Sequence, residues 1–226
     1  MGRPSLLILC YIIHMKSLLF VSLLTFGCAQ AATKELLVVG DSITARASSR
    51  GNAAGWGQYL QDYLPAFHVV NGAIGGKSSK SYWDKYWAGA YGITKPRVVV
   101  LMFGHNDMKP EAFRHTDPQT TYKDYLRNYS AAVKADKAKL ILVTPTERTE
   151  HTGCVSDRLL EPYVVAMKEV AEEDGIQIID IWTKTLQILE SDCFTKSLSY
   201  YADKAHLSKL GASFVARTIA KEIRAE

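Results

Sequence analysis

The chain has 226 residues, and its 27 basic and 23 acidic residues give a formal net charge of +4. The surplus of positive charge is small and the sequence contains no basic run longer than a pair, so we expect no nucleic-acid partner. A chain of this length buries roughly 70% of its unfolded surface, so neither a metal nor a disulfide framework is needed for its stability.

The N-terminal segment has the pattern of a secretory signal peptide. Two apolar runs, residues 6–13 and 18–26, are followed by Ala29-Gln30-Ala31, a small-x-small cleavage site. Met15, just before the second run, is an alternative start. We predict a signal peptide over residues 1–31, a single domain over residues 32–226, and a secreted or periplasmic protein.

Two membrane-attached alternatives fit this leader less well. The uncharged stretch over residues 17–33 is shorter than the ~20 apolar residues that a membrane span needs, so we expect no stable insertion after cleavage. Cys28 leaves a lipoprotein as the other alternative, which Phe26, two residues earlier, disfavours.

Short apolar runs alternate with amphipathic segments along the rest of the chain. Strands are predicted over residues 35–40, 68–71, 97–103, 139–144 and 177–181. Helices are predicted over residues 57–63, 80–91, 121–135, 157–173 and 208–224. The strands are apolar throughout, as expected where helices cover both faces of a sheet. We therefore predict an α/β fold, a three-layer α/β/α sandwich with about five parallel strands.

The candidate nucleophile is Ser42, directly after the first predicted strand. In parallel sheets ligands bind beyond the carboxyl ends of the strands, where Ser42 would project. Asp41 and Ser42 could instead be an ordinary helix cap, and that reading would prevail if the motif stood alone.

A base for this serine is found near the C-terminus, at His206. A serine hydroxyl is a weak nucleophile until a base takes its proton, and the base needs an acceptor that fixes its tautomer. Asp203, three residues before His206, can supply that acceptor from the same turn. The sequence therefore predicts a serine hydrolase with Ser42, His206 and Asp203 as its catalytic residues.

Ester hydrolysis also needs donors that are fixed in place for the developing oxyanion. Gly76, after the second predicted strand, can offer an unobstructed backbone N–H, and Asn106, after the third, can offer its side-chain amide. The backbone N–H of Ser42 is a natural third donor. Alone, the glycine could belong to a plain turn and the asparagine could stabilise one.

These blocks together resemble the GDSL, or SGNH, hydrolases. The blocks are Gly40-Asp41-Ser42-Ile43, Gly76, Gly104-His105-Asn106-Asp107 and Asp203-Lys204-Ala205-His206, and they follow the family's order. The resemblance implies a catalytic triad of Ser42, Asp203 and His206, an oxyanion hole of Ser42, Gly76 and Asn106, a flavodoxin-like sheet and no cofactor.

A narrower resemblance is to the rhamnogalacturonan acetylesterase branch of that family. It rests on Gly55-Trp56-Gly57-Gln58, on residues 71–82 and on Phe103-Gly104-His105-Asn106-Asp107. Lys77 stands where the branch usually has arginine, and residues 87–95 differ from the usual approach to the third strand. This resemblance implies an acylated carbohydrate as the substrate.

The resulting expectation is a secreted serine esterase that removes acetyl groups from carbohydrate, such as rhamnogalacturonan in plant cell walls. A lysophospholipase or thioesterase with the same site and a non-catalytic carbohydrate-binding protein are the alternatives. A metal-dependent hydrolase is disfavoured because the metal-binding residue types show no ligand spacing.

Aromatic and sulfur residues leave two further points open. Trp83 or Trp87 would serve as a sugar-binding surface if exposed at the rim, although packing in the core is the simpler interpretation for each tryptophan. Cys154 and Cys193 are a plausible disulfide pair in an oxidising compartment, with two unpaired thiols as the alternative.

Overall fold

A computed structural model of the whole chain describes residues 34–46, 51–149, 156–191 and 198–225. The predicted leader, Cys154 and Cys193 lie outside these ranges. Within them, no helix is long and apolar enough to cross a membrane.

The centre of the fold is a parallel five-stranded sheet with the strand order β2-β1-β3-β4-β5. The strands are β1 (Lys34–Gly40), β2 (Phe67–Asn71), β3 (Val98–Met102), β4 (Lys139–Val143) and β5 (Gln177–Ile179). The predicted α/β sandwich with five parallel strands is confirmed.

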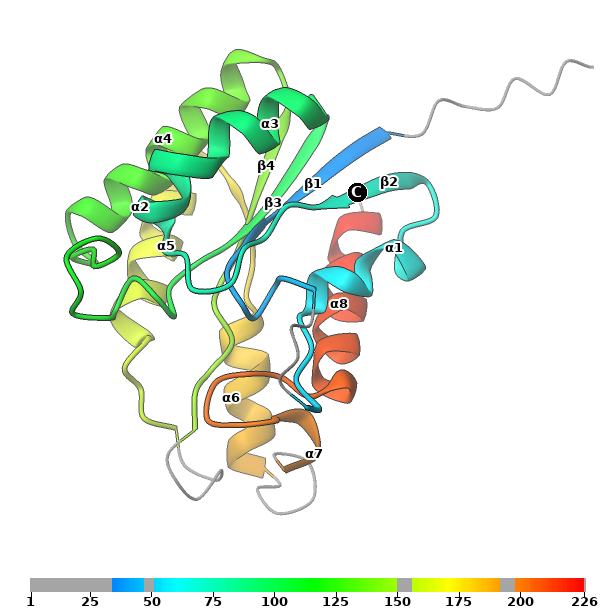
Figure 1. Cartoon of the computed structure of the whole chain (residues 1–226), viewed down its shortest axis with the longest axis vertical. Coiled ribbons are helices and arrows are strands. Elements are labelled where there is room, and N and C mark those ends of the chain that lie inside the picture. Colours follow the sequence, from blue (N-terminus) through cyan, green and yellow to red (C-terminus); the bar gives the residue numbers. More distant parts are fainter. Residues whose placement is uncertain (1–33, 47–50, 150–155, 192–197, 226) are drawn as a thin grey trace, which may run out of the picture. The chain divides into compact units, whose positions relative to one another are not determined.

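Helices cover both faces of this sheet, as Figure 1 shows. The short helices are η1 (Trp56–Gln58), the π-helical η2 (Trp83–Trp87), α1 (Leu60–Tyr63), α2 (Ser79–Tyr82) and α7 (Leu198–Tyr200). The longer helices are α3 (Ala88–Thr94), α4 (Thr121–Ala135), α5 (Glu161–Asp174), α6 (Ile181–Ser191) and α8 (Lys209–Arg224).

Alternation along β1 distributes its side chains between two cores. Leu36 and Val38 pack into the cluster that contains α8, whereas Leu37 and Val39 pack into the cluster that contains α4 and α5. Successive strand residues point to opposite faces, so a strand covered on both sides must be apolar at every position.

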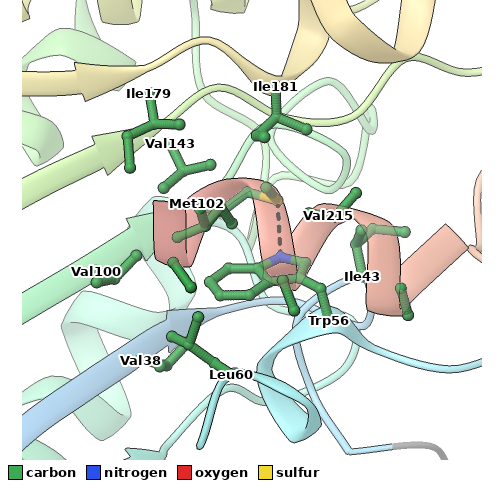
Figure 2. Packing of buried hydrophobic residues seen from close by; sticks show 14 of the residues in the cluster. Val38, Ile43, Trp56, Leu60, Val100, Met102, Val143, Ile179, Ile181 and Val215 are labelled. Atoms are coloured by element: carbon green, nitrogen blue, oxygen red, sulfur yellow. Dashed lines mark hydrogen bonds between the residues drawn. The ribbon is translucent and has the colours of Figure 1, made fainter. Parts of the chain in front are cut away.

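Trp56 lies in the α8-side core, between β1, β3 and α8 (Figure 2). Its indole N–H donates to the sulfur of Met102 at 3.3 Å, and its side chain is fully buried. Packing in the core is therefore the role of this tryptophan, as the simpler interpretation predicted.

The fifth strand was predicted two residues too long, and the helix after it was missed. The strand ends at Ile179 and α6 begins at Ile181. Asp180 accepts the backbone N–H of Thr183 at 3.0 Å, so its side chain starts the helix that the apolar residues had masked. The helical spacing of Trp182, Leu186 and Leu189 was the available signal.

Candidate active site

Ser42 lies in a tight turn directly after β1. The backbone N–H groups of Thr44 and Ala45 donate to the carbonyl of Asp41 at 3.1 and 2.8 Å. The Asp41 carboxylate accepts the N–H of Ile43 at 2.9 Å, which fixes the turn from inside. At Gly40 a Cβ atom would lie 2.8 Å from the carbonyl oxygen of Met102, so only glycine lets β1 approach β3 this closely.

The structure brings Ser42, His206 and Asp203 together in one hydrogen-bonded chain. Ser42 Oγ lies 3.0 Å from His206 Nε2, and His206 Nδ1 lies 2.8 Å from Asp203 Oδ2. The geometry leaves Nδ1 protonated toward the carboxylate and Nε2 available to take the serine proton. This is the arrangement that activates a serine hydroxyl.

The turn that carries Asp203 and His206 is held mostly by hydrogen bonds within residues 202–206. Asp203 Oδ1 accepts the N–H groups of Ala205 and His206 at 2.9 and 2.8 Å, and the backbone N–H of Ala202 donates to the His206 carbonyl at 2.8 Å. In the loop that follows β4, the backbone N–H of Thr149 donates to the Lys204 carbonyl at 2.8 Å.

The environment of the Asp203 carboxylate favours its ionised form. Burial acts to raise the pKa of Asp203, but the N–H groups of Ala205 and His206 and the imidazole outweigh burial and lower that pKa below its usual value. Asp203 therefore stays ionised beside His206.

Gly76 and Gly75 approach the nucleophile from the loop after β2. Gly76 has a φ of +78°, a left-handed conformation that favours glycine. A Cβ atom on Gly75 would lie 3.6 Å from the Cβ of Ser42, which places this loop against the serine.

Asn106 comes from the loop after β3 and is bonded at both ends of its amide. Nδ2 donates to the Lys77 carbonyl at 3.1 Å and to Asp41 Oδ2 at 3.3 Å, while Oδ1 accepts from Arg114 Nη1 at 3.2 Å. The three predicted oxyanion donors thus lie on the loops after β1, β2 and β3, which are adjacent strands in the sheet.

Asp107 holds the Asn106 loop in place through buried hydrogen bonds. Its carboxylate accepts the Ser79 N–H at 3.1 Å, the Ser79 hydroxyl at 2.5 Å and the Thr116 hydroxyl at 3.0 Å, and no part of it is exposed. Burial raises the pKa of Asp107 to about 6, although these hydrogen bonds act in the opposite direction. Its role is to tie the Asn106 loop to α2, not to line the surface of the site.

Asp41 is a second buried carboxylate beside Asn106. Burial raises its pKa to about 7, opposed by the Ile43 N–H and raised further by the charge of Asp107. Two carboxylates in one buried region disfavour each other's ionised form.

Two other histidines in the described part of the chain, His105 and His68, are engaged with other groups. His105 is buried, with Nε2 at 3.3 Å from Thr146 Oγ1. Burial, followed by the charges of Arg148 and His206, lowers the pKa of His105 to about 3, so its ring is neutral. His68 pairs with Glu35 at the amino end of β1, the opposite end of the strand from Ser42.

The tryptophans proposed as a rim surface lie mostly inside. Trp87 is 5% exposed, and Trp83, half-buried, meets Tyr129 edge-to-face at 4.9 Å. Phe113, by contrast, is 61% exposed, and its ring lies 5.4 Å from the guanidinium carbon of Arg114, which contacts Asn106. Sequence reasoning missed both Phe113 and Arg114, because residues 108–120 contain no motif that marks them.

No ligand set for a metal is formed by the described parts of the chain, where no group of three His, Cys, Asp or Glu side chains is close enough to hold an ion.

Known proteins resemble this chain in sequence and in fold. The model of the GDSL-like lipase/acylhydrolase family matches residues 38–213, and the chain belongs to that family. It is a carboxylic ester hydrolase with the α/β fold of the SGNH hydrolases.

Two of the similar proteins are named as members of the predicted branch, the rhamnogalacturonan acetylesterases. The probable rhamnogalacturonan acetylesterase YesY of Bacillus subtilis is 34% identical over 201 residues, covering 84% of this chain and 92% of that protein. The rhamnogalacturonan acetylesterase RhgT of the same species is 30% identical over 190 residues, covering 75% and 80%. A mutant of Axe2, an acetyl-xylooligosaccharide esterase from Geobacillus, superposes with a TM-score of 0.69 at 26% identity, covering 84% and 94%.

Proposed function

We propose that this protein is a serine esterase that removes acetyl groups from carbohydrate, with Ser42 as its nucleophile. The observation that carries the proposal is the chain from Ser42 Oγ through His206 to Asp203, next to the Asn106 amide. Ser42 attacks the ester carbonyl as its proton passes to His206 Nε2.

The tetrahedral intermediate places a negative charge on the former carbonyl oxygen. The N–H groups of Ser42 and Gly76 and the amide of Asn106 are the donors for this oxyanion. When the C–O bond to the leaving alcohol breaks, His206 gives its proton to that oxygen. Water then attacks the acyl-serine by the same route, which releases acetate and restores Ser42.

Carbohydrate as the acylated partner is supported by the relatives named above and by Phe113. YesY and RhgT are described as rhamnogalacturonan acetylesterases, and Axe2 as acting on acetylated xylo-oligosaccharides. The ring of Phe113 is exposed and lies against Arg114, which contacts Asn106, so it is available to stack against a sugar. We propose rhamnogalacturonan, a plant cell-wall polysaccharide, as the first substrate to examine.

The decisive test compares p-nitrophenyl acetate, octanoate and palmitate, with wild type and Ser42→Ala side by side. We expect acetate-selective turnover that Ser42→Ala lowers by about 10⁶-fold, since the variant removes the nucleophile. The melting transition should remain in place. Acetate release from acetylated rhamnogalacturonan and acetylated xylan, with chemically deacetylated samples as controls, then identifies the polymer.

Each contrary outcome has a defined meaning. Retention of most activity in Ser42→Ala would refute the nucleophile. A preference for the long-chain esters would favour the lysophospholipase or thioesterase alternative. Glycan binding without hydrolysis of any ester would favour the carbohydrate-binding alternative.

Export of the protein is also part of the proposal, and it is supported by the leader pattern over residues 1–31. Expression with the leader, followed by N-terminal sequencing of protein from the medium or periplasm, should find a new terminus after Ala31. An intact leader on cytoplasmic protein would contradict this proposal.

A further inference from the structure

Asn106 can serve an oxyanion only if its amide faces the reaction with nitrogen and not with oxygen. The two ends of an asparagine amide have nearly the same shape, so a half-turn about the Cβ–Cγ bond exchanges a donor for an acceptor. Neighbouring groups must therefore select one orientation.

The nitrogen end of this amide is selected by two acceptors. Asp41 Oδ2 lies 3.3 Å from Nδ2, and the Lys77 carbonyl lies 3.1 Å from it. Together they use both hydrogens of the amide, so at least one of these contacts must weaken when Nδ2 turns a hydrogen toward an oxyanion. During the reaction the nitrogen end is held less firmly than at rest.

The oxygen end is selected by a group that can only donate. Arg114 Nη1 lies 3.2 Å from Asn106 Oδ1, and a guanidinium has no acceptor to offer a flipped amide. This contact does not compete with the oxyanion, because it involves the opposite end of the amide.

Arg114 is itself held in a fixed direction. Its Nε donates to Glu111 Oε2 at 3.0 Å, and its Nη2 contacts Glu111 Oε1. The Arg114 side chain is only 19% exposed, whereas that of Glu111 is 45% exposed. The fork shape of the guanidinium lets one edge bind a carboxylate while another nitrogen binds Asn106.

We propose that Arg114 is a positioning residue for the oxyanion hole, which keeps the Asn106 amide in its donating orientation while Nδ2 binds the oxyanion. The role rests on the proposed function, since it requires Asn106 to be an oxyanion donor. Glu111 acts one step further out by holding Arg114.

The test is a double-mutant cycle of Arg114→Ala and Asn106→Ala with p-nitrophenyl acetate as the substrate. Arg114→Ala should lower kcat by about 10- to 100-fold, the loss expected for a hydrogen bond from a charged group, and change KM by less than about twofold. In the Asn106→Ala background the same change should have less than about a twofold effect, because the group it positions is absent.

Two further variants separate positioning from structure. Arg114→Lys should recover only part of kcat, since an ammonium can donate to Asn106 but cannot also form the fork with Glu111. Arg127→Ala is the matched control, because Arg127 also pairs with carboxylates, Glu173 and Asp174, but near the C-terminal end of α5. It should leave kcat unchanged.

The proposal would be overturned if Arg114→Ala lowered kcat by the same factor with and without Asn106, or if it raised KM alone. The first result would mean that Arg114 acts independently of Asn106, and the second that it binds substrate. Failure of the proposed function is seen separately: either the wild type would hydrolyse none of the esters, or Ser42→Ala would remain active, whereas the cycle compares only ratios of kcat.

Discussion

The two sides of the site are built in different ways. On the base side, Asp203 and His206 lie three residues apart, and their turn is held largely by bonds within residues 202–206. On the oxyanion side, Asn106 and Asp107 depend on Asp41 and Ser79, which come from other segments, and on Arg114, which lies further along the same loop.

This difference separates chemistry from stability. Asp203 is 52% exposed on its side chain, so its loss removes few packing contacts. Asp107 is fully buried and satisfies several donors, so its loss leaves those donors unpaired. We therefore expect substitutions on the base side to affect turnover, and those on the oxyanion side to affect stability as well.

The largest effect expected in this comparison of the two sides is that of Asp203→Asn. Asparagine can keep the backbone bonds of the turn through Oδ1, but it cannot stabilise the imidazolium and it favours the wrong tautomer of His206. We expect kcat to fall by about 10⁴-fold with the melting temperature nearly unchanged, measured by ester hydrolysis and thermal unfolding. A large drop in melting temperature would show that this side is not separable from the fold.

The next effect is that of Asp107→Ala on stability. Removing the carboxylate leaves the Ser79 and Thr116 donors without their acceptor, which should cost about 3 kcal/mol of unfolding free energy. For a domain of this size that corresponds to a melting temperature lower by roughly 6–12 °C.

Asp107→Asn is the matched control, because an amide oxygen can still accept at the Oδ1 position. Its loss of stability should be clearly smaller than that of the alanine variant. Equal losses in the two variants would argue that the hydrogen bonds to Ser79 and Thr116 contribute little.

The smallest effect, per pH unit, is a pH dependence carried by His105. The pKa of His105 is lowered from 6.5 to about 3 in the folded protein, so between these values the unfolded chain binds a proton that the folded one does not. This contribution to stability is present above pH 6.5 and is lost as the pH falls. Asp41 and Asp107, with raised pKa values, act in the opposite direction.

Comparison of His105→Gln with wild type isolates this contribution, because both proteins contain the two carboxyls. From pH 6.5 downward the variant should gain about 1.4 kcal/mol per pH unit relative to wild type, measured by urea unfolding. A difference that does not vary between pH 4.5 and pH 7 would show that the buried ring is not kept neutral.

The same contrast explains what could be predicted from sequence. The sheet was predictable because β1, β3 and β4 are short apolar runs, and the Asp203–His206 pair because its spacing is local. The start of α6 was missed because Ile181 continues an apolar run across Asp180, whose capping role depends on where the chain turns. Arg114 was missed because its partner, eight residues away, is reached only through the path of an irregular loop.

The properties of Asp41 also depend on contacts that the sequence alone does not show. It belongs to a recognisable motif, yet its raised pKa comes from burial and from Asp107, 66 positions along the chain. Motif reading identified Asp41 only as a possible helix cap, whereas the fold makes it both a turn stabiliser and a partner of Asn106.

The separation of 164 residues between Ser42 and His206 has a consequence for biosynthesis. The strand before Ser42 and the helix after His206 pack in the same core, so the serine meets its base only after the last helix has docked. Contacts this distant in sequence form late in folding, and the C-terminal segment leaves the ribosome last. A nascent or C-terminally clipped chain should therefore be inert toward esters, and recovery of hydrolysis during refolding should report the docking of α8.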